Sequence, residues 1–512
     1  MRLAVACLMF VGGAVASLAA PTPEQATTKA DAKQPAAPKS AKTPAKPEAL
    51  FTGWTKPRLV LVATGMLEGH IEPCGCTGLT NQKGGFMRRH TLFKQLQKDL
   101  GCEVVGVDVG QLVHRVGRQA EIKYQRMVDG LKKMNYQAAA FGPGDLKLST
   151  GELYSAVAGD DQPGPFVSAN VALFDFDEKL LPTFRVIEKA GMKIGFTSVL
   201  SDSRQRGITG GDVKFKPAAD ALAAVVPKLR SAKCDLLVLL AHASMQETKA
   251  LAQKFPDFHI VVTAGGAAEP PRQVEKLPSG ALLVETGQKG TSVSALGVFA
   301  GTGAARFRYQ VVPLDSRYED SPEMVKLMAT YQDQLRSLWE QGFESYGIRP
   351  LADQNGRKYV GSKTCGECHT KAYEIWEKTP HAHATDSLVK PPERASIARH
   401  FDAECVSCHA TGWEPQEFLP YASGFTSLKA TAHLTGSGCE NCHGPGSNHV
   451  ALENDGDARA DAVTKARQEM RLPLARARQT CLRCHDLDNS PDFSKPGAFE
   501  TYWKKVEHKG KD

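Results

Sequence analysis

A five-residue pattern, Cys-x-x-Cys-His, occurs four times in the last third of the chain and constrains it more than any other feature. The copies end at His369, His409, His443 and His485. Disulfide bonds would account for cysteines in an exported protein, and structural zinc would account for Cys-x-x-Cys pairs. Neither explains why His follows the second Cys every time.

Covalent haem explains every position of this pattern. Two thiols bind the vinyl groups of one porphyrin, and the adjacent His ligates the iron from the proximal side. We therefore predict four haem c groups, made by haem-attachment machinery. The predicted thioether residues are Cys365, Cys368, Cys405, Cys408, Cys439, Cys442, Cys481 and Cys484, and the predicted proximal ligands are His369, His409, His443 and His485.

Six further histidines in this region are candidates for the distal side of four irons: His381, His383, His400, His433, His449 and His508. Residues 356–512 have few long apolar runs, so we expect the porphyrins to supply much of the core. Without haem, this part of the chain is expected not to fold.

Residues 359–485 resemble the tetrahaem cytochrome c family typified by the electron acceptor of hydroxylamine oxidoreductase. The resemblance lies in Trp376…Thr379-Pro380-His381-Ala382 and in "CVSCHATGW", "GFTSL" and "GCENCHGPGSNHV". It implies that His381, His433 and His449 are distal ligands, and that the second haem (His409) stays open. His383 and His400 are alternative distal ligands that would close the open position of the second haem, and His508 is taken as a tail residue.

Residues 57–315 alternate β-rich runs with helical periodicity, which predicts an α/β layered domain with ligand positions at strand ends. The β-rich runs are 58–65, 102–110, 192–200, 235–242 and 258–266, and the helical runs are 84–100, 124–136 and 217–230.

The order of these segments resembles the calcineurin-like metallophosphoesterases, in particular the 5′-nucleotidase and thiosulfohydrolase branch. The motifs are "KGGFMRRHTLFKQL", "VDVGQLV", "AFGPGDL", "FVSANV", "GMKIGFTSVLS" and "LLVLLAHAS". That family holds two metals that activate water. Here Gln111 stands at the bridging Asp position, Pro143-Gly144 replace an Asn-His pair, and "TAGGAAE" replaces Gly-His-x-His.

Few metal ligands remain in this domain. Only His242 stays where the family pattern places a ligand; Asp108 lies just before the bridging position, and Glu68 and His70 are displaced candidates. We favour a catalytically degenerate domain that positions the cytochrome, and a second metal there is not favoured.

Cys74 and Cys76, in "EPCGCTG", form a Cys-x-Cys pair that is too tight for an unstrained mutual disulfide in most backbones. They could bind a soft metal, react with a sulfur substrate, or form disulfides with Cys102 or Cys234. These alternatives stay open.

The remaining segments define the expected organisation. We expect a cleaved signal peptide at 1–20, a Pro/Ala/Lys-rich disordered linker at 21–56, a connecting helical segment at 316–355 that starts at Ser321-Pro322, and the haem domain at 356–512. No run is apolar enough to span a membrane, so we expect a periplasmic protein. The net charge of +7 suits an acidic redox partner, and no nucleic-acid-binding motif is present.

The fold expected is therefore an α/β layered metallophosphoesterase-like domain followed by a mostly α, loop-rich multihaem cytochrome c domain. Periplasmic electron transfer is the favoured function. A multihaem oxidoreductase acting on a small nitrogen or sulfur compound at an open haem comes second. A 5′-nucleotidase-like or thiosulfohydrolase-like enzyme fused to a cytochrome comes third, so whether the chain is an enzyme is left open.

Overall fold

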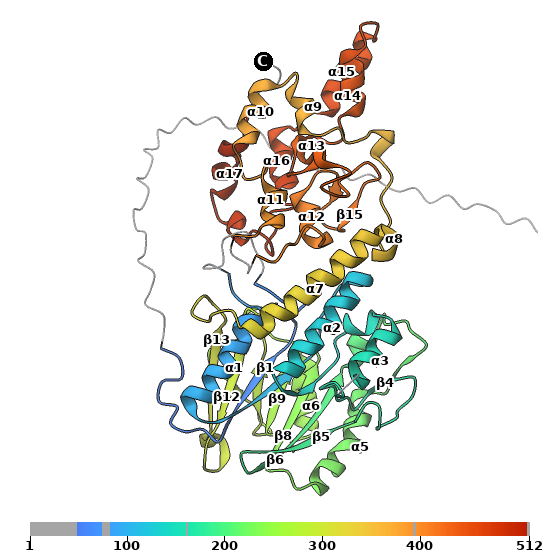
Figure 1. Ribbon diagram of the computed structural model, residues 1–512. Coiled ribbons are helices and arrows are strands. Elements are labelled where there is room, and N and C mark those ends of the chain that lie inside the picture. Colours follow the sequence, from blue (N-terminus) through green and yellow to red (C-terminus); the bar gives the residue numbers. More distant parts are fainter. Residues whose placement is uncertain (1–48, 74–81, 160–161, 393–395, 509–512) are drawn as a thin grey trace, which may run out of the picture. The chain divides into compact units, whose positions relative to one another are not determined.

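The computed structural model describes residues 49–73, 82–159, 162–392 and 396–508, and residues 50–512 form one compact unit (Figure 1). The expected signal peptide, most of the expected linker, and Cys74 and Cys76 lie outside the described residues. Within the described part of the chain, no helix has the length and apolar character needed to cross a membrane.

Two β-sheets form the N-terminal part. The first sheet has the strand order β13-β12-β1-β2-β3 and the second has β10-β11-β9-β8-β6-β5. The first contains β1 (Leu59–Thr64), β2 (Glu103–Asp108), β3 (Tyr136–Ala139), β12 (Ser292–Val298) and β13 (Phe307–Pro313). The second contains β5 (Arg185–Lys189), β6 (Met192–Leu200), β8 (Leu236–His242), β9 (Ile260–Thr263), β10 (Glu275–Lys276) and β11 (Leu282–Glu285). A small separate ribbon pairs β4 (Val171–Leu173) with β7 (Val213–Phe215).

The helices of this part follow the strands in the chain. They are α1 (Phe86–Leu100), α2 (Arg118–Lys133), α3 (Thr150–Ala158), α4 (Asp202–Gln205), α5 (Ala218–Ser231) and α6 (Met245–Lys254). Parallel pairs β1–β2 and β6–β8 are each joined through a helix, as a right-handed crossover requires.

Side chains of β1 alternate between two cores because successive residues of a strand point to opposite faces. Leu59 and Leu61 belong to a core shared with Phe196 of the second sheet. Val60 and Val62 belong to a separate core that contains residues of α1 and α2. On β8, Leu237 and Leu239 join residues of α5 in a third core. The layers are therefore helix, sheet, sheet and helix.

Helix α7 (Pro322–Gln341) follows the α/β part. Ser321 occupies its N-cap position and Pro322 its first turn, where a missing N–H costs nothing. Met324 and Tyr331 on α7 belong to the same core as α1 and α2, and so does Trp339 near its end. This core continues into the following segment through Trp413, whose ring stacks on Trp339 with a centroid distance of 5.8 Å.

The C-terminal part is built of short helices and long connections, as expected for a chain with few apolar runs. Its elements are α8 (Phe343–Tyr346), α9 (Ser362–Gly366), α10 (Thr370–Glu377), α11 (Ala384–Val389), α12 (Ala403–His409), β14 (Trp413–Glu414), β15 (Leu419–Pro420), α13 (Cys439–His443), α14 (Ser447–Asn454), α15 (Ala460–Glu469), α16 (Leu474–Cys481) and α17 (Ala498–Val506). The predicted fold class, an α/β layered domain followed by a mostly helical, loop-rich domain, is confirmed.

Candidate haem sites

Each Cys-x-x-Cys-His motif lies on or beside a short helix. The second and third motifs are contained in α12 and α13, the first begins at the end of α9, and the fourth begins at the end of α16. A helical turn brings residues three and four apart onto one face. No disulfide joins any of the eight cysteines of the motifs, all of which the structure describes, so each pair is available for two thioether bonds to one porphyrin.

The ring nitrogens of two proximal histidines are already oriented. Nδ1 of His409 lies 2.9 Å from the carbonyl oxygen of Ala384, and Nδ1 of His443 lies 2.7 Å from the carbonyl oxygen of Met470. A carbonyl can only accept, so Nδ1 carries the proton and Nε2 keeps its lone pair. Metal-ligating histidines commonly have this arrangement.

Three of the four proximal histidines face a second imidazole. The ring centroids are 6.2 Å apart for His369 and His449, 6.0 Å for His485 and His381, and 5.8 Å for His443 and His508. Two imidazoles that ligate one metal from opposite sides, each through a bond of about 2 Å, have ring centres roughly 6 Å apart. The residues present therefore fit haem irons held between two histidines.

Burial favours the neutral imidazole that ligation needs. Burial lowers the pKa of His381 to about 4, and it also lowers the pKa values of His443, His449 and His485. Nδ1 of His449 is 3.6 Å from a carboxylate oxygen of Glu453, which can orient the ring.

The ring positions differ from the sequence-based choice of distal ligands at two histidines. His508, taken as a tail residue, lies opposite His443, whereas the described contacts bring His433 to none of the four proximal rings. His433 lies exposed in the 3₁₀ turn η4 (Ala432–Leu434), and its carbonyl packs over Gly361. No local signal separates His508 from a tail residue, because its partner is far away in the sequence.

His409 is the proximal histidine for which no opposing imidazole is found among the described residues. The two substitutes have other neighbours. His383 is exposed, with Nδ1 3.5 Å from Asp386, and the ring of His400 lies 4.0 Å from that of Phe401.

The cysteines show which motifs are neighbours. A hydrogen bond with the Cys365 thiol lowers the pKa of Cys439 to about 7, and a hydrogen bond with the Cys484 thiol lowers the pKa of Cys408. Burial raises the pKa of Cys442 to about 12, and the nearby Cys481 adds to this shift. The attachment sites are therefore adjacent in the order first, third, fourth, second.

A buried carboxylate joins the first and third motifs. Glu440, inside the third motif, accepts hydrogen bonds from the backbone N–H groups of Val360, Gly361 and Gly446. Ser362 Oγ also accepts from the backbone N–H of Cys439 at 3.1 Å. The close packing of the first and third motifs therefore depends on Glu440, which occupies a variable position of the Cys-x-x-Cys-His pattern.

An ion pair joins the second and fourth motifs. Arg483, inside the fourth motif, places Nη2 2.5 Å from a carboxylate oxygen of Glu414, five residues after His409. Both the first–third and the second–fourth contacts are thus made by the variable residues of a motif.

In the α/β part, Asp108 lies at the carboxyl end of β2 in the first sheet and His242 lies at the carboxyl end of β8 in the second sheet, and each is bonded locally. Asp108 accepts a hydrogen bond from the Thr64 hydroxyl at 2.6 Å and from Gly110 N–H at 2.9 Å, and burial raises its pKa. Nδ1 of His242 is 2.8 Å from the carbonyl oxygen of Val109, and burial lowers its pKa to about 4.

The loops that carry metal ligands in the resembled family are tied to each other here. The Asp145 carboxylate accepts three backbone hydrogen bonds, from Gln111, Val113 and Gly142. The side-chain oxygen of Gln111 accepts from Gly144 N–H at 3.0 Å. Sequence reasoning missed Asp145, although its place in "GPGDL" after a strand was visible.

One displaced candidate, His70, bonds to the backbone through its side chain, whereas Glu68 contributes its own backbone carbonyl to a contact with His114. Nδ1 of His70 is 3.0 Å from the carbonyl oxygen of Leu67, and the carbonyl of Glu68 is 3.0 Å from Nδ1 of His114. In the part of the chain that the structure describes, no three His, Cys, Asp or Glu side chains gather as a metal site would require. Cys102 and Cys234 carry free thiols.

The motifs, their oriented histidines and their packed helices define a c-type cytochrome region. Residues 364–444 match the family model described as cytochrome c554 and c-prime. A relative, cytochrome c-554 from Nitrosomonas europaea, is 29% identical over 168 residues, which cover 30% of this chain and 68% of the relative.

Solved structures similar to this chain include a sulfate thiohydrolase and a 5′-nucleotidase precursor. The sulfate thiohydrolase SoxB of Thermus thermophilus, in complex with glycerol, has 12% identity and a TM-score of 0.47 over 55% of this chain. A 5′-nucleotidase precursor from the same organism has 20% identity and a TM-score of 0.46 over 65% of this chain. The chain spans 61% and 66% of these two proteins. The C-terminal part of the chain thus has the motifs of a multihaem c-type cytochrome and is similar to the cytochrome c554 family, which implies covalently bound haem c. It follows an α/β layered domain.

Proposed function

We propose that this protein is a periplasmic tetrahaem cytochrome that transfers electrons between redox partners. The observation that carries the proposal is the set of three opposed imidazole pairs, each containing the histidine of an attachment motif. Haem iron supplies one-electron chemistry when bound. An iron held between two histidines has no open position for a substrate, so such sites suit electron transfer.

In this proposal, electrons pass between haems in the order in which the attachment cysteines are adjacent. That order runs from the haem of the first motif to those of the third, fourth and second motifs. Cys365 adjoins Cys439, Cys442 adjoins Cys481, and Cys408 adjoins Cys484. The cysteines would anchor the porphyrins, and the three opposed histidine pairs would hold three of the four irons. The backbone carbonyls at Nδ1 of His409 and His443 hold those rings in one tautomer.

The proposed partner is a periplasmic redox protein with an acidic surface. The net charge of +7 supports this choice, because opposite net charges speed encounter between proteins. Faster electron transfer with an acidic than with a basic partner, with the difference lost at high salt, is the expected behaviour.

The α/β domain acts, in this proposal, as a scaffold for the haem region. Its strand-end loops are held by Asp145 and by the Gln111–Gly144 hydrogen bond, whereas the resembled enzymes use such loops to hold metals. The side chains that remain, Asp108 and His242, are bonded to neighbouring residues.

A second candidate function is redox catalysis on a small nitrogen or sulfur compound at the second haem. It is favoured by one observation, namely that His409 has no opposing imidazole among the described residues. A ligand-dependent change in the optical spectrum would support this function.

Metal analysis of purified, haem-loaded protein tests the proposal. We expect four irons per chain, all accounted for by covalent haem, and no stoichiometric manganese, zinc or copper. One or two additional metals per chain would instead show that the α/β domain has rebuilt a metal site, and would restore the hydrolase alternative.

A further inference from the structure

The carboxyl-end loops of the first sheet contact the segment that leads into the second haem motif. In α/β domains these loops form the usual ligand site. Here residues 69–72, which follow β1, and the first half of α2 reach residues 399–404, immediately before Cys405. The second motif is therefore the one that the α/β domain holds directly through buried charges.

The first of these contacts is an ion pair between Arg399 and Glu72. Nη2 of Arg399 lies 2.7 Å and 2.8 Å from the two carboxylate oxygens of Glu72. The two side chains are 6% and 11% exposed. Such a pair fixes the direction in which the chain enters the second motif.

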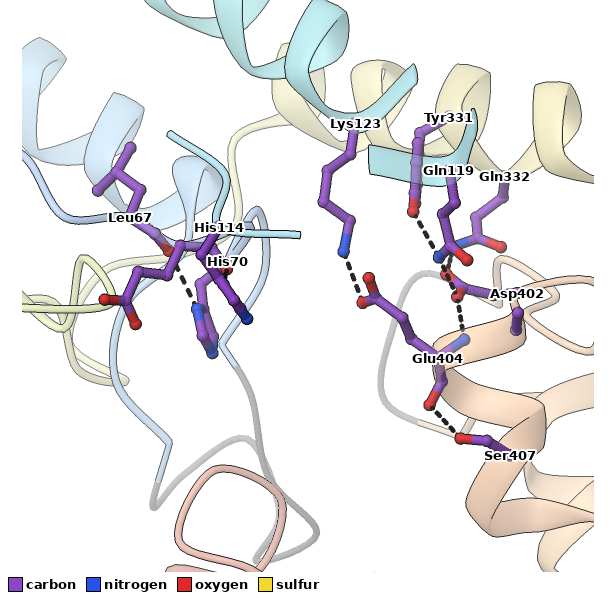
Figure 2. Close-up of polar contacts among 12 residues, drawn as sticks. Leu67, His70, His114, Gln119, Lys123, Tyr331, Gln332, Asp402, Glu404 and Ser407 are labelled. Atoms are coloured by element: carbon purple, nitrogen blue, oxygen red, sulfur yellow. Dashed lines mark hydrogen bonds and ion pairs between the residues drawn. The ribbon is translucent and has the colours of Figure 1, made fainter. Parts of the chain in front are cut away.

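The second contact is made by Asp402, at the N-cap of α12. Its two carboxylate oxygens accept hydrogen bonds from Gln119 at 2.7 Å and from Gln332 at 2.8 Å, and Oδ1 also accepts from Glu404 N–H (Figure 2). The amides that hold Asp402 come from α2 and α7. The start of α12 is thus fixed on two sides by neutral donors.

The third contact is an ion pair between Lys123 of α2 and Glu404, the residue before Cys405. Nζ of Lys123 lies 2.5 Å from a carboxylate oxygen of Glu404, and its side chain is 9% exposed (Figure 2). Gly69, with φ of +89°, passes over the lysine stem, and a Cβ there would lie 3.3 Å from its Cδ. The lysine is therefore held in one position.

Neighbouring groups determine which side chains around Lys123 and Glu404 are charged. Burial lowers the pKa of His70 to about 4, so this histidine adds no charge at neutral pH. Burial raises the pKa of Glu404, but the charge and hydrogen bond of Lys123 outweigh it and the net pKa is lowered. The Arg115 guanidinium also lowers the pKa of Glu404. Lys289, which acts on His70, is paired with Asp488. A cation and an anion thus remain next to Cys405.

We propose that Lys123 and Glu404 are positioning residues that set the reduction potential of the haem attached at Cys405 and Cys408. Reduction adds one electron to ferric iron, so a fixed cation stabilises the reduced state and a fixed anion opposes it. In a partly buried site both effects exceed those at the surface. This inference rests on the proposed function, and it gives the α/β domain a specific role in it.

The test is a spectroelectrochemical titration of the haem-loaded full-length protein. The variants are Lys123→Met, Glu404→Gln and the double variant. We expect Lys123→Met to lower one midpoint potential and Glu404→Gln to raise the same one. The double variant should lie between them, and the other three potentials should stay in place.

Potential shifts of opposite sign in the two single variants distinguish an electrostatic role from a structural one. If the substitutions only loosened the second motif, both would shift the midpoint potential in the same direction. Shifts of one sign, no shift, or loss of the second haem in a charge-removing variant would each overturn the proposal. Lys123→Arg, which keeps the charge, should leave the potential near that of the wild type.

A matched control comes from an exposed ion pair of the same type. Lys94 and Glu323 lie 2.6 Å apart and their side chains are 49% and 50% exposed. Lys94→Met and Glu323→Gln should leave all potentials unchanged. The wild-type titration separates the two claims. Fewer than four one-electron steps would contradict the proposed tetrahaem function. Four steps, with the same midpoint potentials in the variants, would contradict only the role of Lys123 and Glu404.

Discussion

His508 illustrates how a single residue completes a site from a distance. It follows α17, and its Nδ1 lies 2.9 Å from the carbonyl oxygen of Val506, which directs the other ring nitrogen away from its own backbone. Its ring centre is 5.8 Å from that of His443. The segment after α17 would therefore supply a ligand to the iron of a haem attached at the third motif.

We predict that His508→Ala converts the third haem from low spin to high spin without loss of the covalent porphyrin. The physical reason is that the iron loses one of its two strong-field nitrogens. Electron paramagnetic resonance of the oxidised protein measures the change. The matched variant His433→Ala should leave the spectrum unaltered, and a high-spin signal from it instead of from His508→Ala would refute the assignment.

His242 makes the stability of the α/β domain depend on pH. Its pKa is lowered to about 4 by burial, from 6.5 in the unfolded chain. The folded state therefore binds fewer protons than the unfolded state between these values. The contribution is fully present above pH 6.5 and is lost as the pH falls towards 4.

We predict that His242→Asn reduces the loss of stability between pH 7 and 4.5 by about 2 kcal/mol. Asparagine keeps a donor for the carbonyl of Val109 but does not titrate. Denaturant unfolding monitored by far-UV circular dichroism at several pH values gives the comparison. Identical slopes for wild type and variant would show that His242 does not control this pH dependence.

At the scale of elements, α7 is the one that joins the two parts of the core. Trp339, near its C-terminus, is 7% exposed, stacks on Trp413, and donates a hydrogen bond from Nε1 to the carbonyl of Thr426 at 2.8 Å. Phe343 and Tyr346 of α8 pack edge-on against the same ring. One side chain thus connects α7 with α8, with Trp413 of β14 and with the backbone at Thr426.

We predict that Trp339→Ala destabilises the protein by about 3–5 kcal/mol, the usual cost of removing a buried aromatic side chain. Trp339→Phe keeps most of the packing and loses the hydrogen bond to Thr426, so it should cost only about 1–3 kcal/mol. Unfolding in guanidinium, measured on haem-loaded protein, ranks the variants. Equal costs would mean that the hydrogen bond, and not the ring contact, holds this junction.

Local elements could be predicted from the sequence because their signals are local. The β-rich runs at 58–65, 102–110 and 192–200 became β1, β2 and β6. The start of α7 at Ser321-Pro322 was also predicted. What the alternation could not reveal was that the strands divide into two stacked sheets, since that depends on which strands pair over long distances.

At the scale of the whole molecule, the haem attachment residues could be predicted because each motif is contiguous. The opposed imidazoles could be predicted only in part, since His381 and His485 are about a hundred residues apart in the sequence and meet only in the fold. The Lys123–Glu404 pair could not be predicted for the same reason, because its two residues are far apart in the sequence and lie in regions that resemble different families. Charges of opposite sign are too common in a sequence to indicate such a contact.

We propose a molecule whose second haem is held by its α/β domain and differs in ligation from the other three. Spin quantitation by electron paramagnetic resonance on the fully oxidised, haem-loaded protein tests this account most directly. We predict three low-spin ferric centres and one high-spin ferric centre per chain. Four low-spin centres, or more than one high-spin centre, would contradict the assignment of axial ligands.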